Sequence, residues 1–302
     1  MQDGGPDRRT GTPLVAPGVG VGMEEDPERV AWFADASVAD VDALATNIAE
    51  GAASEPADWP GIAVDTGFVT NEADYETVLH EAAVRAAATA VETRESATDR
   101  QLVHAIRTLD DLERVANELA ERIAEWAATT SLEAPAGPAG AATLSETTPH
   151  SPVEARIVAI AAIVADLIDQ RDRLEAEIER SMHDVAPNMS AIAGPLLGAR
   201  LLSLAGDLET LARSPSGTVQ VLGAEDALFA HLRGNAPSPK HGIIYTHPYV
   251  RETRPADRGS AARAFAGKLT IAARIDYYTG ERRPSIDEEL ADRIATIRER
   301  AE

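Results

Sequence analysis

The most extended hydrophobic pattern in the chain has helical spacing. No Gly or Pro occurs from residue 68 to residue 134, and apolar residues recur there in steps of three and four. Such steps are typical of a coiled-coil seam. The seam consists of Leu102, Ile106, Leu109, Leu112, Ala116, Leu119, Ile123 and Trp126. It predicts one helix from about Ala73 to Thr129, roughly 85 Å long at about 1.5 Å per residue. A helix of that length requires a partner.

A second run without Gly or Pro extends from residue 153 to 186. Its seam consists of Val153, Ile157, Ile160, Val164, Leu167, Leu174 and Ile178. Residues 135–152 are rich in Pro, Gly, Ala and Thr, which indicates a linker between the two helices. Residues 73–186 therefore predict a long antiparallel coiled-coil hairpin, with an ordinary helical-bundle core as the alternative. Because the first helix is longer than the second, we expect a homodimer through the coiled coil, with contacts at Leu109, Leu112, Leu119 and Ile123.

The N-terminal part of the chain has shorter patterns. Residues 1–27 are rich in Gly, Pro and charged side chains, which predicts a disordered tail. Short apolar runs at residues 31–33 and 61–64 predict strands, and residues 38–50 between them predict a helix. We therefore expect a small α/β module over residues 28–72.

The C-terminal part alternates helical patterns with Gly and Pro breaks. Helices are predicted over residues 196–212, 224–232, 257–277 and 286–300, with a loop at residues 234–242. The fold class is therefore mainly α. It combines the small α/β N-terminal module, the long antiparallel coiled-coil hairpin and an all-α C-terminal domain over residues 187–302.

Charge distinguishes one region from the rest. The formal net charge is -22, with many carboxylates and no cysteine, a composition typical of salt-in halophiles, in which acidity says little about binding partners. From His231 to Pro284, however, ten Lys and Arg residues outnumber four Asp and Glu residues, and four of the five tyrosines lie here. Phosphates attract Lys and Arg, and bases stack on aromatic rings. This basic region indicates a nucleic-acid partner.

Several residues of the basic region are candidates for RNA contacts. They are Lys240, His241, His247, Arg258, Arg263 and Lys268. Arg263 and Arg274 fall within about 20° of one helix face, which suits two contacts to a sugar-phosphate chain. For Arg274, an internal ion pair with Asp207 or Asp276 is an equally good interpretation. Tyr245, by contrast, is assigned to the hydrophobic core.

The sequence contains no motif that indicates catalysis. A P-loop, a GxSxG motif, an HExxH motif and a paired-carboxylate pattern are all missing. His241 and His247 lack further metal ligands nearby. We therefore expect neither an enzyme, nor a metal site, nor a cofactor bound by this chain. No apolar run approaches the roughly 18 to 20 residues of a membrane span, so we expect a cytoplasmic protein without membrane contact.

Three stretches of this part of the chain resemble the Nop domain. They read LGAEDALFAHL, PKHGIIYTHPYV and RGSAARAFAGKLTIAARID. The resemblance is strong from about residue 190 to 276, looser through the coiled coil and weak in the N-terminal module. The chain resembles the archaeal Nop proteins, which are relatives of the eukaryotic nucleolar Nop fifty-six and fifty-eight proteins.

The resemblance implies a scaffold of box C/D guide ribonucleoproteins, which direct 2′-O-methylation of rRNA and tRNA. The Nop domain would bind a composite surface formed by the kink-turn of the box C/D guide RNA and a kink-turn-binding ribosomal-type protein. The N-terminal module would bind fibrillarin, the methyltransferase to which S-adenosylmethionine belongs. The coiled coil would dimerise. The alternatives are a structural coiled-coil protein without an RNA-specific role and, with less support, a stand-alone RNA-modifying enzyme.

The resemblance also assigns residues. Lys240, His247, Arg258, Arg263 and Lys268 would face RNA, together with the helix at Ala227, Leu228 and Phe229, which in relatives caps the guide duplex. Two positions depart from the family pattern, because Asp226 and Ala230 stand where the family usually has Lys and often has Arg. Arg233 lies about one turn beyond Ala230 and is the candidate substitute.

Overall fold

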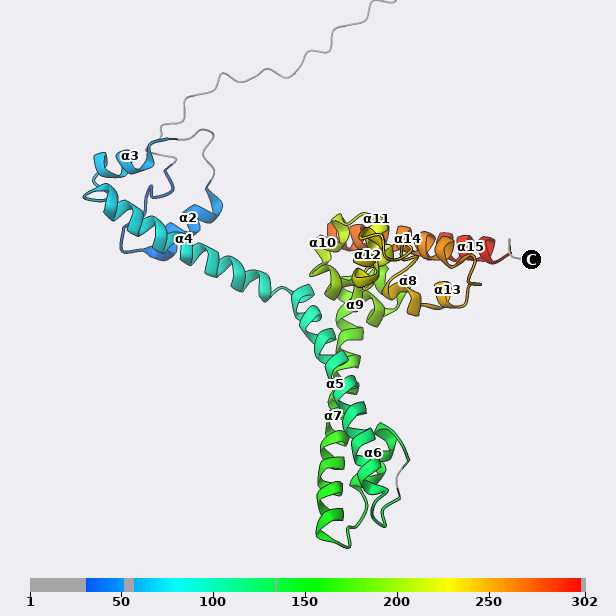
Figure 1. Cartoon of the computed structure of the whole chain (residues 1–302). Helices are drawn as coiled ribbons and strands as arrows, with labels where there is room; N and C mark the ends of the chain where they lie inside the picture. Colours follow the sequence, from blue (N-terminus) through cyan, green and yellow to red (C-terminus); the bar gives the residue numbers. More distant parts are fainter. Residues whose placement is uncertain (1–30, 52–56, 134, 300–302) are drawn as a thin grey trace, which may run out of the picture. The chain divides into compact units, whose positions relative to one another are not determined.

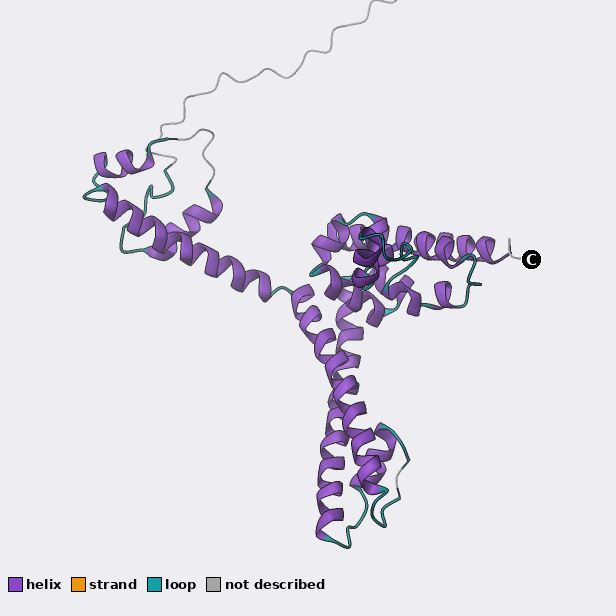
Figure 2. Cartoon of the chain, in the orientation of Figure 1, coloured by secondary structure: helices purple, strands orange, loops and turns teal. Residues whose placement is uncertain are grey.

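The computed structural model describes residues 31–51, 57–133 and 135–299, so the predicted tail at residues 1–27 lies outside the described residues. Helices and loops make up all of the described part, which contains no strand (Figure 2). This confirms the prediction of a mainly α protein. The chain divides into two compact units, residues 1–93 and 94–302, and the predicted domain boundaries after residues 72 and 186 stay predictions.

The first unit contains α2 (Val41–Glu50), α3 (Trp59–Asp65) and most of α4 (Glu72–Glu95). Its core is built around aromatic rings. Phe33 stacks on Phe68 with ring centroids 4.8 Å apart, and Tyr75 meets Phe33 edge-on at 6.2 Å. The indole of Trp32 donates a hydrogen bond of 3.1 Å to the hydroxyl of Tyr75. Aromatic packing thus holds the loop at residues 31–36 against α4.

The two predicted strands of this unit are wrong. Residues 31–35 form turns, and residues 61–64 lie inside α3. The side chain of Asp58 accepts a hydrogen bond from the backbone N–H of Gly61, and Pro60 lies in the first turn of the helix. An N-terminal Asp cap followed by Pro favours a helix over a strand. The described residues therefore form a helical module, whereas the sequence predicted an α/β module.

The first long helix is interrupted, which corrects the prediction of one helix from Ala73 to Thr129. α4 ends at Glu95, and α5 (Thr98–Ala127) begins after an extended residue, Ala97. The side-chain amide of Gln101 donates to the Glu95 carbonyl at 2.7 Å, and Arg100 donates to the Glu95 carboxylate at 2.7 Å. Gln101 thus satisfies a backbone carbonyl that a continuous helix would bond internally, and the Arg100–Glu95 ion pair further stabilises the break.

The predicted antiparallel hairpin is confirmed. α5 and α7 (Pro152–Val185) run side by side in opposite directions (Figure 1). Ser151 caps α7 by accepting from the Glu154 N–H at 3.1 Å, as expected for a Ser-Pro start. The predicted linker contains a further helix, α6 (Pro138–Ser145), whose Ala141 and Leu144 are buried against α5 and α7.

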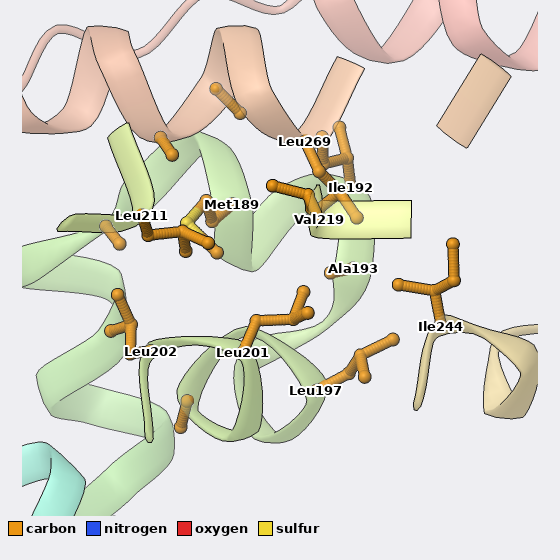
Figure 3. Packing of buried hydrophobic residues seen from close by; sticks show 14 of the residues in the cluster. Met189, Ile192, Ala193, Leu197, Leu201, Leu202, Leu211, Val219, Ile244 and Leu269 are labelled. Carbon is orange, nitrogen blue, oxygen red and sulfur yellow. The ribbon is translucent and has the colours of Figure 1, made fainter. Parts of the chain in front are cut away.

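The remainder of the second unit is a cluster of short helices around one long helix, α14 (Arg258–Tyr278). The other elements are α8 (Pro187–Ala193), α9 (Pro195–Ala205), α10 (Leu208–Arg213), α11 (Ser216–Val221), α12 (Glu225–Leu232), the 3-10 helix η1 (Ile243–Thr246), α13 (Pro248–Arg251) and α15 (Ser285–Glu299). α14 packs against α8, α10, α11, α13 and α15. Figure 3 shows Leu269 of α14 and Val219 of α11 meeting Ile192 of α8 in the core.

One helix of this cluster differs from its prediction, and one further element is added. The predicted helix at residues 196–212 is divided in two, because Gly206 has a φ of 104°, a conformation that favours glycine. Asp207 then caps α10 by accepting from the Thr210 N–H at 2.7 Å. The apolar segment after Gly242 forms the 3-10 helix η1.

A buried polar contact joins α8 to α14. The carboxylate of Asp276, 6% exposed, accepts hydrogen bonds from the backbone N–H and side-chain amide of Asn188 at 3.0 and 2.7 Å and from the Met189 N–H at 2.9 Å. The Asn188 amide also donates to the Glu281 carbonyl, and its oxygen accepts from the Arg283 N–H. Asn188 thereby fixes the segment that follows α14.

Within the described part of the chain, no helix is both long enough and apolar enough to cross a membrane. The same residues include no group of three or more His, Asp or Glu side chains placed to hold a metal ion.

Candidate nucleic-acid interface

Five side chains of the basic region meet near the N-terminal end of α14. We call them the cationic cluster: Lys240, His241, Tyr245, Arg258 and Arg263. The stem of Lys240 lies against α14, with its nearest atom 3.8 Å from the place that a Cβ at Gly259 would occupy. Arg263 follows Gly259 by four residues and is therefore one turn further along the same side of the helix. Lys240 and Arg263 are both exposed.

Three members of the cationic cluster are stacked. The imidazole of His241 lies over the ring of Tyr245 with centroids 4.6 Å apart and planes 19° apart. The Arg258 guanidinium lies 5.3 Å from the centroid of the same Tyr245 ring, within cation–π range. Arg258 also donates to the carbonyls of Thr253 and Arg251 at 3.0 and 3.2 Å. Its charge is thus held in a fixed position.

Burial, followed by repulsion from Arg258 and Lys240, lowers the pKa of His241. The ring is therefore uncharged near neutral pH and presents a flat aromatic surface next to two cations. Tyr245, which the sequence assigned to the core, is only half-buried; it packs against the core and also carries the His241 stack. The interface consequently offers an aromatic surface that the sequence prediction did not include.

Backbone hydrogen bonds hold the loop of Lys240 and His241 in place. The Gly242 N–H donates to the Gln220 carbonyl at 2.8 Å, and the Ile243 N–H donates to the Leu222 carbonyl at 2.7 Å. The Gln220 side chain in turn donates to the Lys240 carbonyl at 2.7 Å. A Cβ at Gly242 would overlap the Leu222 carbonyl, so this close approach of loop and α11 requires glycine.

Three other predicted contacts have partners within the protein. Lys268 forms an ion pair with Glu289 of α15. Arg274 donates to the Ala212 carbonyl at 3.0 Å, so its internal partner is a carbonyl and not the carboxylate of Asp207 or Asp276. The third residue, His247, packs at the edge of the hydrophobic core against Phe265. As RNA contacts, Lys268 and His247 stay predictions.

His247 has a clear structural role. Its Nδ1 accepts a hydrogen bond of 3.2 Å from the Tyr249 N–H and so caps α13. Its ring lies 4.5 Å from that of Phe265, which is fully buried in α14. Burial lowers the pKa of His247 to about 4. The imidazole is therefore neutral at pH 7, as its acceptor role requires.

α12 presents an apolar surface to solvent. None of its residues is buried, and Phe229 and Leu232 are 55% and 70% exposed. Ala227 is also exposed and Leu228 is half-buried, while Arg233 at the C-cap is exposed. The sequence indicated Ala227, Leu228 and Phe229, but it did not indicate Leu232. The signal for Leu232 was the spacing of three from Phe229, which puts both side chains on one side of a helix.

The predicted dimer contacts are largely used inside the chain. Leu109 and Ile123 are buried, whereas Leu112 and Leu119 are half-buried. Leu109 belongs to the core shared with α8, α9 and α14, and Ile123 belongs to the core of α5, α6 and α7. Intrachain packing therefore accounts for much of the seam, and dimerisation through these residues stays a prediction.

The chain is similar to several known proteins. A family model described as "Nop: snoRNA binding domain, fibrillarin" matches residues 69–299. An uncharacterised NOP5 family protein of Methanocaldococcus jannaschii is 48% identical over 142 residues, which cover 47% of this chain and 34% of the relative. Nucleolar protein 56 of Saccharomyces cerevisiae is 42% identical over 118 residues, covering 39% of this chain and 23% of the relative. The chain thus spans about a third or less of these two relatives.

One solved structure extends the likeness to most of the chain. A chain from the crystal structure of a fibrillarin/Nop5p complex matches with a TM-score of 0.52 and 27% sequence identity, and the match covers 84% of this chain and 92% of that chain. The family model covers well over half of the sequence and includes α12, η1 and all of α14. The cationic cluster and its helical support therefore lie in a Nop domain, and the chain belongs to the Nop family.

Proposed function

We propose that this chain is a non-catalytic scaffold of a box C/D guide ribonucleoprotein. The observation that carries the proposal is the cationic cluster, a preorganised set of cations and stacked rings in a chain with a formal charge of -22. The family description as a snoRNA-binding domain supports it. Lys240, Arg258 and Arg263 would contact phosphates, and the stack of His241 on Tyr245 would receive an unpaired base.

The finer parts of the proposal concern partners. The Nop domain binds the kink-turn of the guide RNA together with a ribosomal-type protein, and the exposed apolar residues of α12 cap the guide duplex. The N-terminal unit binds fibrillarin, which brings its own S-adenosylmethionine. The similarity to a chain in the crystal structure of a fibrillarin/Nop5p complex supports fibrillarin as the partner. The scaffold contributes proximity, because holding the methyltransferase near its substrate converts a bimolecular encounter into a local one.

Removing single cations tests the RNA-binding proposal. Arg263→Ala and Lys240→Ala each remove an exposed charge without an intramolecular partner among the described residues. We expect about tenfold weaker binding of a kink-turn RNA with its ribosomal-type partner, measured by fluorescence anisotropy. Each variant should also reduce the slope of log K against log salt by about 1.

Arg122→Ala is the matched control, because Arg122 is an exposed arginine on the coiled-coil hairpin, away from the cationic cluster. It should bind RNA like the wild type. Wild-type affinity in both cluster variants would contradict the site, and no binding by the wild-type protein would favour the structural coiled-coil alternative.

We further propose a homodimer through the coiled coil, with α7 providing the contact surface. Ile163 is 55% exposed, and Val153 on the same helix is also exposed. Half-buried Ile160 and Leu167 lie at heptad spacing from Val153. A second copy would remove this apolar surface from water, which would stabilise the dimer by about 25 cal/mol for each Å² of apolar area buried.

Ile163→Asp should therefore halve the molar mass measured by light scattering. Ile271→Asp, at an exposed isoleucine of α14, is the control and should leave the mass unchanged. Ile123→Asp is unsuitable because Ile123 is buried within the chain, so the substitution would unfold the hairpin. A monomeric wild-type protein, or an unchanged mass for Ile163→Asp, would rule out this contact surface.

A further inference from the structure

α14 has an exposed surface without acidic side chains. Among its 21 residues, the only carboxylate is that of Asp276, which is buried against Asn188. Five exposed side chains of α14 and Gly267 fall on one face, within about 80° at 100° per residue. We call this face the α14 stripe, and it consists of Ser260, Arg263, Gly267, Ile271, Arg274 and Tyr278. In a chain with 50 acidic residues, such a face is suited to an anionic partner.

The border of the α14 stripe toward α10 and α11 is also free of acids. Residues 210–224 contain no Asp or Glu, and the bond from Arg274 to the Ala212 carbonyl ties the stripe to α10. The exposed Arg213 of α10 is hydrogen-bonded with Tyr278, which raises the pKa of the guanidinium. The stripe therefore ends in an aromatic ring next to a cation.

Two carboxylates near the α14 stripe are already paired. Glu209 lies 2.7 Å from Arg213 and 3.8 Å from Arg94, and it is hydrogen-bonded with Tyr277. On the other flank, Glu289 forms the ion pair with Lys268. These two carboxylates therefore leave no uncompensated negative charge on the flanks formed by α10 and α15.

The side chains of the α14 stripe suit a single strand of RNA. Arg263 and Arg274 can contact phosphates, while Ile271 and Tyr278, 42% and 65% exposed, can pack against bases. Apart from its own helix backbone and chain neighbours, no atom of the described residues lies within 4 Å of the place that a Cβ at Gly267 would occupy, so a backbone can approach the helix closely there. The distance from Arg263 to Tyr278 is about 22 Å along the axis, enough for on the order of six nucleotides at about 3.4 Å each.

We propose that the α14 stripe binds a single-stranded RNA segment that continues from the cationic cluster, with a base stacked on Tyr278. Arg263 belongs to both surfaces and connects them. The proposal rests on the proposed RNA-binding function, and it adds a second contact region at the opposite end of α14. A duplex would fit less well, because its bases are not available to stack on a tyrosine ring.

Extended RNAs test this proposal with the full-length chain. A kink-turn RNA bound to its ribosomal-type partner is compared, by fluorescence anisotropy, with the same RNA carrying eight uridines at its 5′ or 3′ end. We expect one of the extensions to raise the affinity about tenfold, because its bases can stack on an aromatic side chain. Tyr278→Ala should abolish this gain and leave binding of the unextended RNA unchanged.

Two further variants complete the test. Tyr278→Phe keeps the ring and should keep the gain, whereas Lys240→Ala should weaken binding of all the RNAs and also keep the gain. The proposal is overturned if neither extension increases affinity or if Tyr278→Ala retains the increase. If the unextended RNA does not bind at all, the proposed function fails, and a free twelve-nucleotide oligouridine then decides the inference. If the oligouridine binds the wild-type protein but not Tyr278→Ala, the α14 stripe is supported as an RNA-binding surface. If the oligouridine does not bind the wild-type protein, the inference is overturned.

Discussion

Replacing Asp276 by Ala is expected to lower the free energy of unfolding of the second unit by about 3 to 5 kcal/mol, the usual range when one member of a buried charged network is removed. Asp276 accepts from the backbone N–H groups of Asn188 and Met189 and from the Asn188 side chain. All three donors would lose their acceptor in a buried place. An unsatisfied buried donor costs about 1 to 3 kcal/mol.

Two opposing influences act on the buried carboxylate of Asp276. Burial raises the pKa of its carboxyl, and the three N–H donors and the nearby Arg282 oppose that rise. Burial thus disfavours the charged carboxylate, and the hydrogen bonds from Asn188 and Met189 offset that cost. Asn188 also donates to the Glu281 carbonyl and accepts from the Arg283 N–H. If Asn188 moves when Asp276 is removed, the connection between α14 and α15 also loosens.

Urea unfolding followed by far-ultraviolet circular dichroism measures the effect of Asp276→Ala. Ser151→Ala is the control, because it removes a single helix-capping hydrogen bond from Glu154 in the same unit, with an expected cost of about 1 kcal/mol. Equal midpoints for Asp276→Ala and Ser151→Ala would mean that the three donors find other acceptors, and the structural role assigned to Asp276 would be wrong.

Helical periodicity predicted much of the fold because it reports which face of a helix is buried. It identified the hairpin and the long helix α14, whose face with Arg263 and Arg274 is outward in the structure. The break at Ala97 was missed, because the hydrogen bonds that stabilise it come from the side chains of Arg100 and Gln101, and both residues are also good helix formers.

Sequence could not show which polar groups meet across the fold. Lys268 and Arg263 both carry a positive charge, yet among the residues that the structure describes only Lys268 of the two has a carboxylate opposite, from Glu289 on α15. The stack of His241 on Tyr245 likewise depends on how η1 approaches the loop before it. The strands predicted at residues 31–33 and 61–64 failed for a different reason. Short apolar runs do not distinguish a strand from a buried helical turn, and the cap by Asp58 decides in favour of the helix.

Acidification should destabilise the second unit through His247. In the unfolded chain a histidine has a pKa of about 6.5, whereas burial lowers the pKa of His247 in the fold to about 4. Above pH 6.5 the ring is neutral in both states and adds no pH dependence. Between about 6.5 and about 4 only the unfolded state takes up the proton, so stability falls as the pH falls. Over this window the loss is about 3 kcal/mol.

The change of His247→Asn isolates this contribution from the many carboxylates that titrate in the same range. Asparagine does not titrate and can still cap α13 by accepting from the Tyr249 N–H. At pH 7 the wild type should be more stable, because the His247 ring packs on Phe265. From pH 7 to pH 4 the wild type should lose about 3 kcal/mol more of its unfolding free energy than the variant does. Parallel stability curves across this range would show that His247 accepts a proton without disturbing the fold, in conflict with its buried acceptor role.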